Sequence, residues 1–293
     1  MNPLVSYTIY NIKGVVVNVK RLLAALVLLV LCAGAAVAAP LDVFKDMKGT
    51  LDIAGGTAHI PVMNKAAQSI MTFNGDIRIT VAGGGSGVGV KQAGEGLVGI
   101  GNTGRPLKES EIKEYGLETF PFAIDGVAVV VNPKNTVRAL TAKQIAGIYA
   151  GTVKDWGEVG GEPGAINVYG REDGSGTRET FTEKILGKTE LAPSVNVVSS
   201  NGAMKTAVAQ DARAIGYVGI GHIEESIAGI VIDGMIPSQE NAANGSYTVV
   251  RNLFMNTKGT PTGLTAAFID YIYSADGARF ITESGYIPVP RGQ

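Results

Sequence analysis

Short apolar segments that end in glycine-rich turns alternate with amphipathic segments along most of this 293-residue chain. The segment at 50–56 is predicted to be a strand and is followed by a predicted helix at 59–73. The same order recurs at 166–170 and 176–186. Thr141 and Gln144 form a capping-box pattern that predicts the start of a further helix at 142. Repetition of strand, turn and helix predicts an α/β fold with mostly parallel sheets.

Two long apolar segments, at 127–132 and 247–256, stand apart from these short units. We expect both to be strands that cross between two lobes, because each is too long and too continuous for a simple strand–helix unit. The middle of the chain would then form one lobe and its two ends the other. The predicted boundaries are 39–126 and 251–293 for the first lobe and 127–250 for the second.

The composition is that of an ordinary folded protein. Hydrophobic residues make up 45% and charged residues 17% of the chain, and the formal net charge is −1. The chain carries no basic block beyond Lys20 and Arg21. This charge balance argues against a nucleic-acid partner.

The N-terminal region has the pattern of a secretory signal. Lys20 and Arg21 precede an uncharged apolar run, and alanines at 36 and 38 fit a small-x-small cleavage site. The pattern predicts a signal peptide over 1–38 that is removed during secretion across the inner membrane, which would place the protein in the periplasm. A retained membrane anchor is the alternative, since the run is near spanning length.

Cysteine and histidine are scarce. The one cysteine, Cys32, lies inside the apolar run after Leu31, where a lipoprotein signal needs a small residue. The secreted chain is therefore predicted to have neither a thiol nor a disulfide. The two histidines, His59 and His222, are far apart and show no metal-site spacing, so we expect neither a metal nor another cofactor.

Three glycine-rich turns, at 54–61, 83–90 and 170–177, each precede a predicted helix. The first turn of a helix has unpaired N–H groups and the positive end of the helix dipole, so it suits an anion. Glycine lets the backbone approach closely, and Ser or Thr adds a neutral donor. Three such turns that converge on one cleft would bind a tetrahedral oxyanion.

The third turn adds charged residues to this pattern. Arg171, Asp173, Ser175 and Thr177 lie within a few residues around two glycines. Arginine offers a two-pronged donor to an oxyanion, and Asp173 is placed to orient it. Helix capping by the hydroxyl residues and a surface ion pair between Arg171 and Asp173 are the alternatives.

The sequence argues against an enzyme. A nucleophile elbow needs G-x-S-x-G, but Ser175 has Asp173 two positions before it and Ser86 has Val88 two positions after it. The glycine turns match neither the dinucleotide-binding pattern nor the Walker loop. No residue is predicted to be catalytic, and the turns are better suited to a small anion than to a nucleotide.

The stretch "REDGSGTRETF" at 171–181 resembles the signature of the periplasmic phosphate-binding proteins that feed ABC-type phosphate importers. Further segments of that family's pattern follow its order along nearly all of the secreted chain. They are "GGTAHIP", "GSGVGVKQ", "GIGNTGRPL", "IAGIYAGTVKDWGEVGG", "AIGYVGIG" and "FIDYIYSADGARFITESGYIPV".

This resemblance implies a two-lobed type II periplasmic binding protein fold, with each lobe a mostly parallel sheet flanked by helices. It also implies inorganic phosphate as ligand, delivery to the membrane permease of an ABC importer, and a monomer. The ligand-binding residues that the resemblance carries over are Thr57, Ala58, Ser86, Arg171, Asp173, Ser175, Gly176 and Thr177, with His59 beside the first turn. Asp173 would orient Arg171.

One position departs from the family pattern. Some members have Asp, which accepts a proton from phosphate, and others have Ser where this chain has Gly104. Thr103 or Arg105 would have to compensate. Another tetrahedral oxyanion (sulfate, arsenate or molybdate) therefore remains an alternative ligand, and an oxyanion sensor that presents its ligand to a receptor remains an alternative role.

Overall fold

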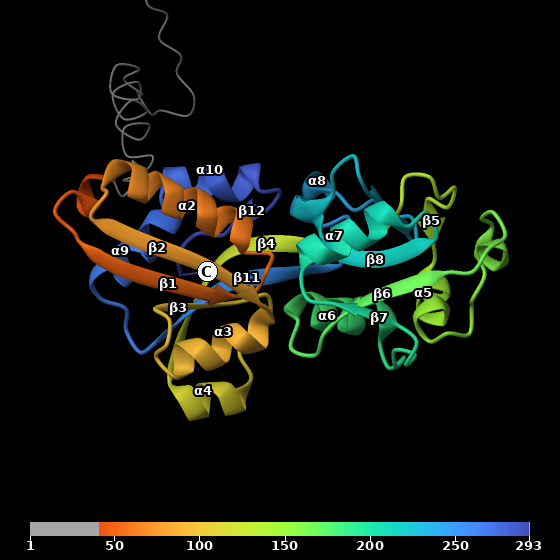
Figure 1. Cartoon of the computed structure of the whole chain (residues 1–293), viewed down its shortest axis with the longest axis horizontal. Coiled ribbons are helices and arrows are strands. Elements are labelled where there is room, and N and C mark those ends of the chain that lie inside the picture. Colours follow the sequence, from red (N-terminus) through yellow and green to blue (C-terminus); the bar gives the residue numbers. More distant parts are fainter. Residues whose placement is uncertain (1–40, 293) are drawn as a thin grey trace, which may run out of the picture. The chain divides into compact units, whose positions relative to one another are not determined.

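A ten-stranded mixed sheet runs through the part of the chain that the computed structural model describes, residues 41–292 (Figure 1). Its main path has the strand order β2-β1-β3-β11-β4-β8-β6-β7. The pairs β1–β2, β1–β3, β6–β7 and β6–β8 are parallel, whereas β11 is antiparallel to both β3 and β4. The predicted α/β fold is confirmed. The predicted signal peptide at 1–38 lies outside the described residues.

The strands are β1 (Gly49–Gly55), β2 (Ile77–Gly84), β3 (Ile100–Thr103), β4 (Leu117–Val131), β5 (Ala139–Leu140), β6 (Asn167–Arg171), β7 (Asn196–Val198), β8 (Ala214–Gly219), β9 (Ala228–Gly229), β10 (Val231–Ile232), β11 (Val250–Lys258) and β12 (Ile287–Pro288). The helices are η1 (Leu41–Phe44), α2 (Ile60–Phe73), α3 (Gly85–Gly94), α4 (Glu109–Tyr115), α5 (Ala142–Tyr149), η2 (Trp156–Val159), α6 (Gly176–Phe181), the π-helical η3 (Thr182–Leu186), α7 (Asn201–Gln210), η4 (Ile220–His222), α8 (Gln239–Ala243), α9 (Gly263–Ile272) and α10 (Ala275–Glu283).

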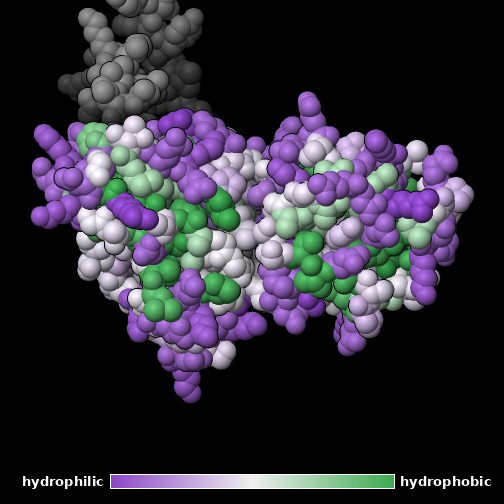
Figure 2. Space-filling model, viewed as in Figure 1, coloured by the Kyte–Doolittle hydropathy of each residue, from purple (hydrophilic) through white to green (hydrophobic). Residues whose placement is uncertain are grey.

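These helices and strands pack around two large, separate hydrophobic cores. The first core is built from segments at both ends of the described chain, including α2, β1, α9 and α10. The second core is built from the middle, including α5, β8 and α7. Figure 2 shows that hydrophobic residues also reach the surface of both parts of the molecule on this face, among hydrophilic side chains. The molecule thus has two lobes, and the exact boundaries between them stay a prediction.

Strands β4 and β11 connect the two lobes. Phe122 and Ala123 of β4 pack in the first core, whereas the valines from 127 onward pack in the second. The expectation of two crossing strands is confirmed, although β4 begins at Leu117, before the segment that was predicted. Pro121 lies within the early part of this strand, where a proline argues against a strand in a sequence pattern.

Local signals explain most of the helix ends. Thr141 and Gln144 form the expected capping box at α5, since Gln144 N donates to Thr141 Oγ1 at 3.1 Å and Thr141 N donates to Gln144 Oε1 at 2.8 Å. Gly116 ends α4 in the left-handed conformation, with φ of 62°. Helix α7 was not predicted from the sequence. Ser200 caps it by accepting a hydrogen bond from Ala203 N at 2.9 Å.

The predicted helix over 176–186 changes character part-way. It is α-helical as far as Phe181 and continues as the π-helical turn η3. Within residues 41–292, we find no helix with the length and apolar character needed to cross a membrane.

Candidate functional site: a polar pocket between the lobes

The three glycine-rich turns converge on one small pocket. Each turn follows a strand. The parallel strands β1 and β2 end side by side, and β6 of the other lobe runs in the opposite direction, so its carboxyl end points back toward theirs. The residues that line the pocket are Gly56, Thr57, Ala58, His59, Gly85, Ser86, Gly104, Arg171, Ser175, Gly176, Thr177 and Arg251. Seven of the eight residues predicted to bind a ligand are in this set, and Asp173 is not. Their role in binding stays a prediction.

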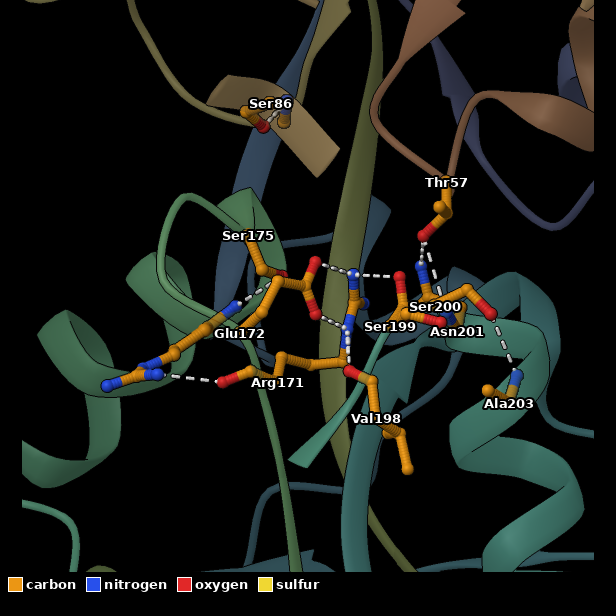
Figure 3. A network of polar contacts seen from close by, with 12 residues as sticks. Thr57, Ser86, Arg171, Glu172, Ser175, Val198, Ser199, Ser200, Asn201 and Ala203 are labelled. Carbon is orange, nitrogen blue, oxygen red and sulfur yellow. Dashed lines mark hydrogen bonds and ion pairs between the residues drawn. The ribbon is translucent and has the colours of Figure 1, made fainter. Parts of the chain in front are cut away.

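The first turn, between β1 and α2, contributes Thr57. Its Oγ1 accepts hydrogen bonds from Asn201 N at 3.3 Å and from Asn201 Nδ2 at 3.1 Å. Because both acceptor sites of the hydroxyl are used, its proton is left to donate to another group. Figure 3 shows Thr57 reaching from its turn toward Asn201 at the start of α7. This contact joins the two lobes beside the pocket.

The second turn, between β2 and α3, contributes Ser86, whose side chain is buried. Ser86 Oγ accepts a hydrogen bond from Gly104 N at 3.0 Å. Gly85, just before it, has φ of 83°, a conformation that favours glycine. No side chain caps α3 at its first turn. The serine hydroxyl and the start of this helix therefore both face the pocket as donors.

The third turn places Arg171 at the end of β6, with only 1% of its surface exposed. Its Nε and Nη2 donate to the two carboxylate oxygens of Glu172 at 3.0 and 2.8 Å. The same two nitrogens also reach the carbonyls of Val198 at 3.1 Å and Ser199 at 3.3 Å (Figure 3). Nη1 is buried and has no hydrogen-bond partner among the described residues. The guanidinium is thus fixed along one edge and free at one nitrogen.

The prediction that Asp173 orients Arg171 is wrong. The Asp173 side chain is 94% exposed and pairs with Arg178 at 2.8 Å, outside the pocket. Glu172 orients Arg171 instead. The chain turns at Gly174, whose φ is 81°, and Asp173 lies on the outer side of this turn. The sequence signal for the true partner was the acidic residue directly after the arginine, Glu172.

Arg251 is a pocket residue that the sequence analysis missed. It lies on β11, in register with Asp125 of β4, and both side chains are buried. Arg251 Nε and Nη2 donate to Asp125 Oδ2 at 3.1 and 2.8 Å. Burial raises the pKa of Asp125, and the adjacent Arg251 opposes that rise. The available signal was a charged residue of opposite sign inside each of the two long strands.

His59 adds no charge to the pocket near neutral pH. Burial, followed by the nearby charge of Arg251, lowers the pKa of His59 to about 3. The neutral ring places Nδ1 at 3.0 Å from the carbonyl oxygen of Gly56, so Nδ1–H donates there. The pocket charges are therefore those of the two arginines, Arg171 and Arg251.

Comparison with known proteins identifies the family. A family profile described as a PBP superfamily domain matches residues 46–276. The phosphate-binding protein PstS of Bacillus subtilis (strain 168) is 36% identical over 244 residues, which cover 82% of this chain and 81% of that protein. The chain belongs to the PstS family of phosphate-binding proteins. The PstS protein of Pseudomonas aeruginosa (strain PAO1) is 28% identical, with 93% of this chain and 96% of that protein covered.

Solved structures agree with this family. One is a putative phosphate ABC transporter substrate-binding protein from Clostridium perfringens with bound phosphate. It matches with a TM-score of 0.78 and 34% identity, over 82% of this chain and all of that chain. An ABC-type phosphate transport receptor from Vibrio cholerae matches with a TM-score of 0.65 and 33% identity, over 81% of this chain and 99% of that chain. The expected type II periplasmic binding protein fold is therefore confirmed.

Gly104 lines the pocket, and the structure defines the contacts of the two residues next to it. Thr103 Oγ1 donates to the carbonyl of Arg105 at 2.8 Å, and the Arg105 guanidinium pairs with Glu111 at 2.7 Å. Neither Thr103 nor Arg105 lines the pocket. The expectation that one of them compensates for the missing side chain is wrong. Arg251 is the side chain that lies beside Gly104.

Proposed function

We propose that this protein binds inorganic phosphate in the pocket and delivers it to the membrane permease of an ABC importer. The observation that carries the proposal is Arg171, a fully buried guanidinium with one unpartnered nitrogen in a pocket of hydroxyl and glycine residues. A buried charge needs a counter-charge or hydrogen-bond partners. Glu172 occupies one edge of the guanidinium, and an oxyanion in the pocket would bind the free Nη1.

Hydroxyl donors complete the proposed site. Thr57 and Ser86 each accept backbone or amide hydrogen bonds, so their protons are free for an anion. Ser175 and Thr177 at the start of α6 lie on the opposite wall. Donors from separate turns suit a tetrahedral anion, whose oxygens point in four directions. The relative from Clostridium perfringens, 34% identical, is described with bound phosphate, which supports this ligand.

The role in transport is inferred from the relatives. Their names describe phosphate-binding proteins and a phosphate transport receptor, not enzymes. We infer that this protein acts in the periplasm, that it works as a monomer, and that it does not turn its ligand over. His59 is the one histidine among the described pocket-lining residues, and its Nδ1 is engaged by the carbonyl of Gly56.

Calorimetry of the purified protein against phosphate tests the proposal. We expect a dissociation constant in the micromolar range or tighter, equivalent to roughly −8 kcal/mol or better. p-Nitrophenyl phosphate, offered as an ester substrate, should release no phosphate in steady state. Absence of phosphate binding would refute the proposed function. Turnover of the ester that is lost in Ser175→Ala would instead show an enzyme.

A further inference from the structure

Two arginines present a similar arrangement to the pocket. Arg171 uses Nε and Nη2 to bind Glu172, and Arg251 uses Nε and Nη2 to bind Asp125. The side chains of the two arginines are 1% and 5% exposed. Arg171 Nη1 is buried without a hydrogen-bond partner, and Arg251 Nη1 makes no hydrogen bond within residues 41–292. The two nitrogens of Arg171 bind both oxygens of Glu172, whereas those of Arg251 bind one oxygen of Asp125. Both arginines thus have one edge held by a carboxylate and line the pocket.

Gly104 makes room for Arg251. A β carbon at Gly104 would lie 2.7 Å from Arg251 Nη1, which is closer than real β carbons approach, and 3.1 Å from Cζ. The backbone of Gly104 is outside the left-handed region, so its conformation does not require glycine. The guanidinium from the distant strand β11 occupies the space beside the Gly104 backbone, and a larger residue at 104 would displace it.

The pocket contains cationic and hydroxyl donors but no carboxylate. Among its described lining residues, none is Asp or Glu. Glu172 and Asp125 each bind an arginine and do not line the pocket, and Asp125 Oδ1 has no hydrogen-bond partner among the described residues. A carboxylate in a binding site accepts the proton of a partly protonated anion and repels an anion that has no proton. Without one, the pocket has no side chain that penalises a fully ionised tetrahedral anion.

We propose that Arg251 is a second anion-binding arginine, and that with Gly104 it makes the pocket select tetrahedral oxyanions by charge, so that sulfate competes with phosphate. This inference rests on the proposed function, because it assigns the selectivity of the same pocket. Two guanidinium nitrogens and several hydroxyls offer donors to every oxygen of the anion. Neither arginine distinguishes a protonated oxygen from a bare one by repulsion.

The test replaces the buried pair by neutral groups of similar shape. Asp125→Asn combined with Arg251→Gln removes the guanidinium without leaving a buried carboxylate unpaired. The matched control is Asp276→Asn with Arg279→Gln, an exposed ion pair on α10 with an N–O distance of 3.2 Å. Dissociation constants for phosphate and sulfate are measured by calorimetry at low salt, and circular dichroism verifies folding.

We expect the wild-type protein to bind sulfate within about 100-fold of phosphate. The buried-pair variant should bind both anions about 10- to 100-fold more weakly. That factor corresponds to the free energy lost when one hydrogen bond to a charged group is removed. The control pair should bind both as the wild type does. If the wild type binds neither anion, the proposed function fails before this inference is reached.

Two outcomes would overturn the inference while phosphate binding stands. One is a folded buried-pair variant that binds phosphate within about threefold of wild type, which would show that Arg251 does not contact the anion. The other is a wild type that excludes sulfate by about 10⁴-fold, as sites do when a wrong ligand leaves buried groups unpaired. If the double variant does not fold, Arg251→Lys decides. Lysine keeps a positive charge beside Asp125 but lacks the guanidinium, which can bind Asp125 and the anion at the same time. Phosphate affinity within about threefold of wild type in that variant would equally refute the contact.

Discussion

Replacing Arg171 by alanine should weaken phosphate binding more than truncating any other pocket residue. The side chain is 1% exposed, and its removal leaves the Glu172 carboxylate and the carbonyls of Val198 and Ser199 without a donor. It also leaves the bound anion without its buried counter-charge. Removing one partner of a buried charged pair typically costs about 3–5 kcal/mol. At about 1.4 kcal/mol per tenfold, the dissociation constant should rise by roughly two to three and a half orders of magnitude.

The assay is calorimetric titration with phosphate, with thermal unfolding as a check on the fold. Arg178→Ala is the matched control, because Arg178 belongs to the same turn but lies outside the pocket lining. Arg178 donates to the carbonyl of Arg171 at 2.8 Å and pairs with the exposed Asp173. Because its side chain is 27% exposed, we expect its loss to change phosphate affinity by about threefold or less.

Arg171→Lys separates charge from geometry. Lysine keeps a cation but cannot bind Glu172 with one edge and the anion with another nitrogen. We expect an affinity between those of wild type and Arg171→Ala. If Arg171→Ala is folded and binds phosphate within about threefold of wild type, the reasoning is refuted and the anion binds elsewhere.

Three further predictions follow from the pocket. Glu172→Gln should weaken phosphate binding about tenfold, because the charge-assisted hydrogen bonds that fix the Arg171 guanidinium are lost. Asp173→Asn should leave the phosphate affinity unchanged. Tighter phosphate binding by Glu172→Gln would mean that the Glu172 carboxylate mainly repels the anion. Burial, and then Arg251, lowers the pKa of His59 to about 3, so the folded state stays neutral while the unfolded state gains a proton below about 6.5. Urea unfolding without phosphate should show that the stability contributed by neutral His59 is lost as pH falls below about 6.5, by about 2 kcal/mol between pH 7 and 5. Burial also lowers the pKa of His222, to about 4, so His222 adds its own loss and His59→Gln should remove only the share due to His59. Equal pH dependence in both proteins would contradict this. Gly104→Asp should weaken both anions, because its β carbon displaces the Arg251 guanidinium. The loss should be larger for sulfate in competition titrations, because a carboxylate accepts a hydrogen bond from protonated phosphate and repels sulfate, and an equal loss for both anions would contradict this.

The convergence of the three turns was only partly predictable from the sequence. Strands followed by glycine-rich turns and helices indicate parallel pairing, which gathers the first two turns at the carboxyl ends of β1 and β2. The third turn meets them because β6 runs opposite to β1, which follows from the successive antiparallel pairings of β3, β11, β4 and β8. The turns at 54–61, 83–90 and 170–177 do meet in one pocket. Local signals such as the capping box at Thr141 also predicted what the structure contains, because they depend on residues three positions apart.

The partners of the two arginines could not be predicted in the same way. Which of two adjacent acids orients Arg171 depends on the conformation of the turn at Gly174. The pairing of Arg251 with Asp125 depends on the register of β4 and β11, which shifts at a bulge between Leu253 and Phe254. A shift of one residue moves every side chain to the other face of a strand. Register across 126 positions of sequence separation is a property of the folded sheet, not of either strand.

The crystal structure of this protein grown with phosphate tests the central claim most directly, through the distance from Arg171 Nη1 to the nearest phosphate oxygen. We predict phosphate density in the pocket, an Nη1–oxygen distance of about 2.7–2.9 Å, and hydroxyl contacts from Thr57 and Ser86. Density for phosphate elsewhere, or a pocket phosphate more than about 3.5 Å from Arg171 Nη1, would contradict the account.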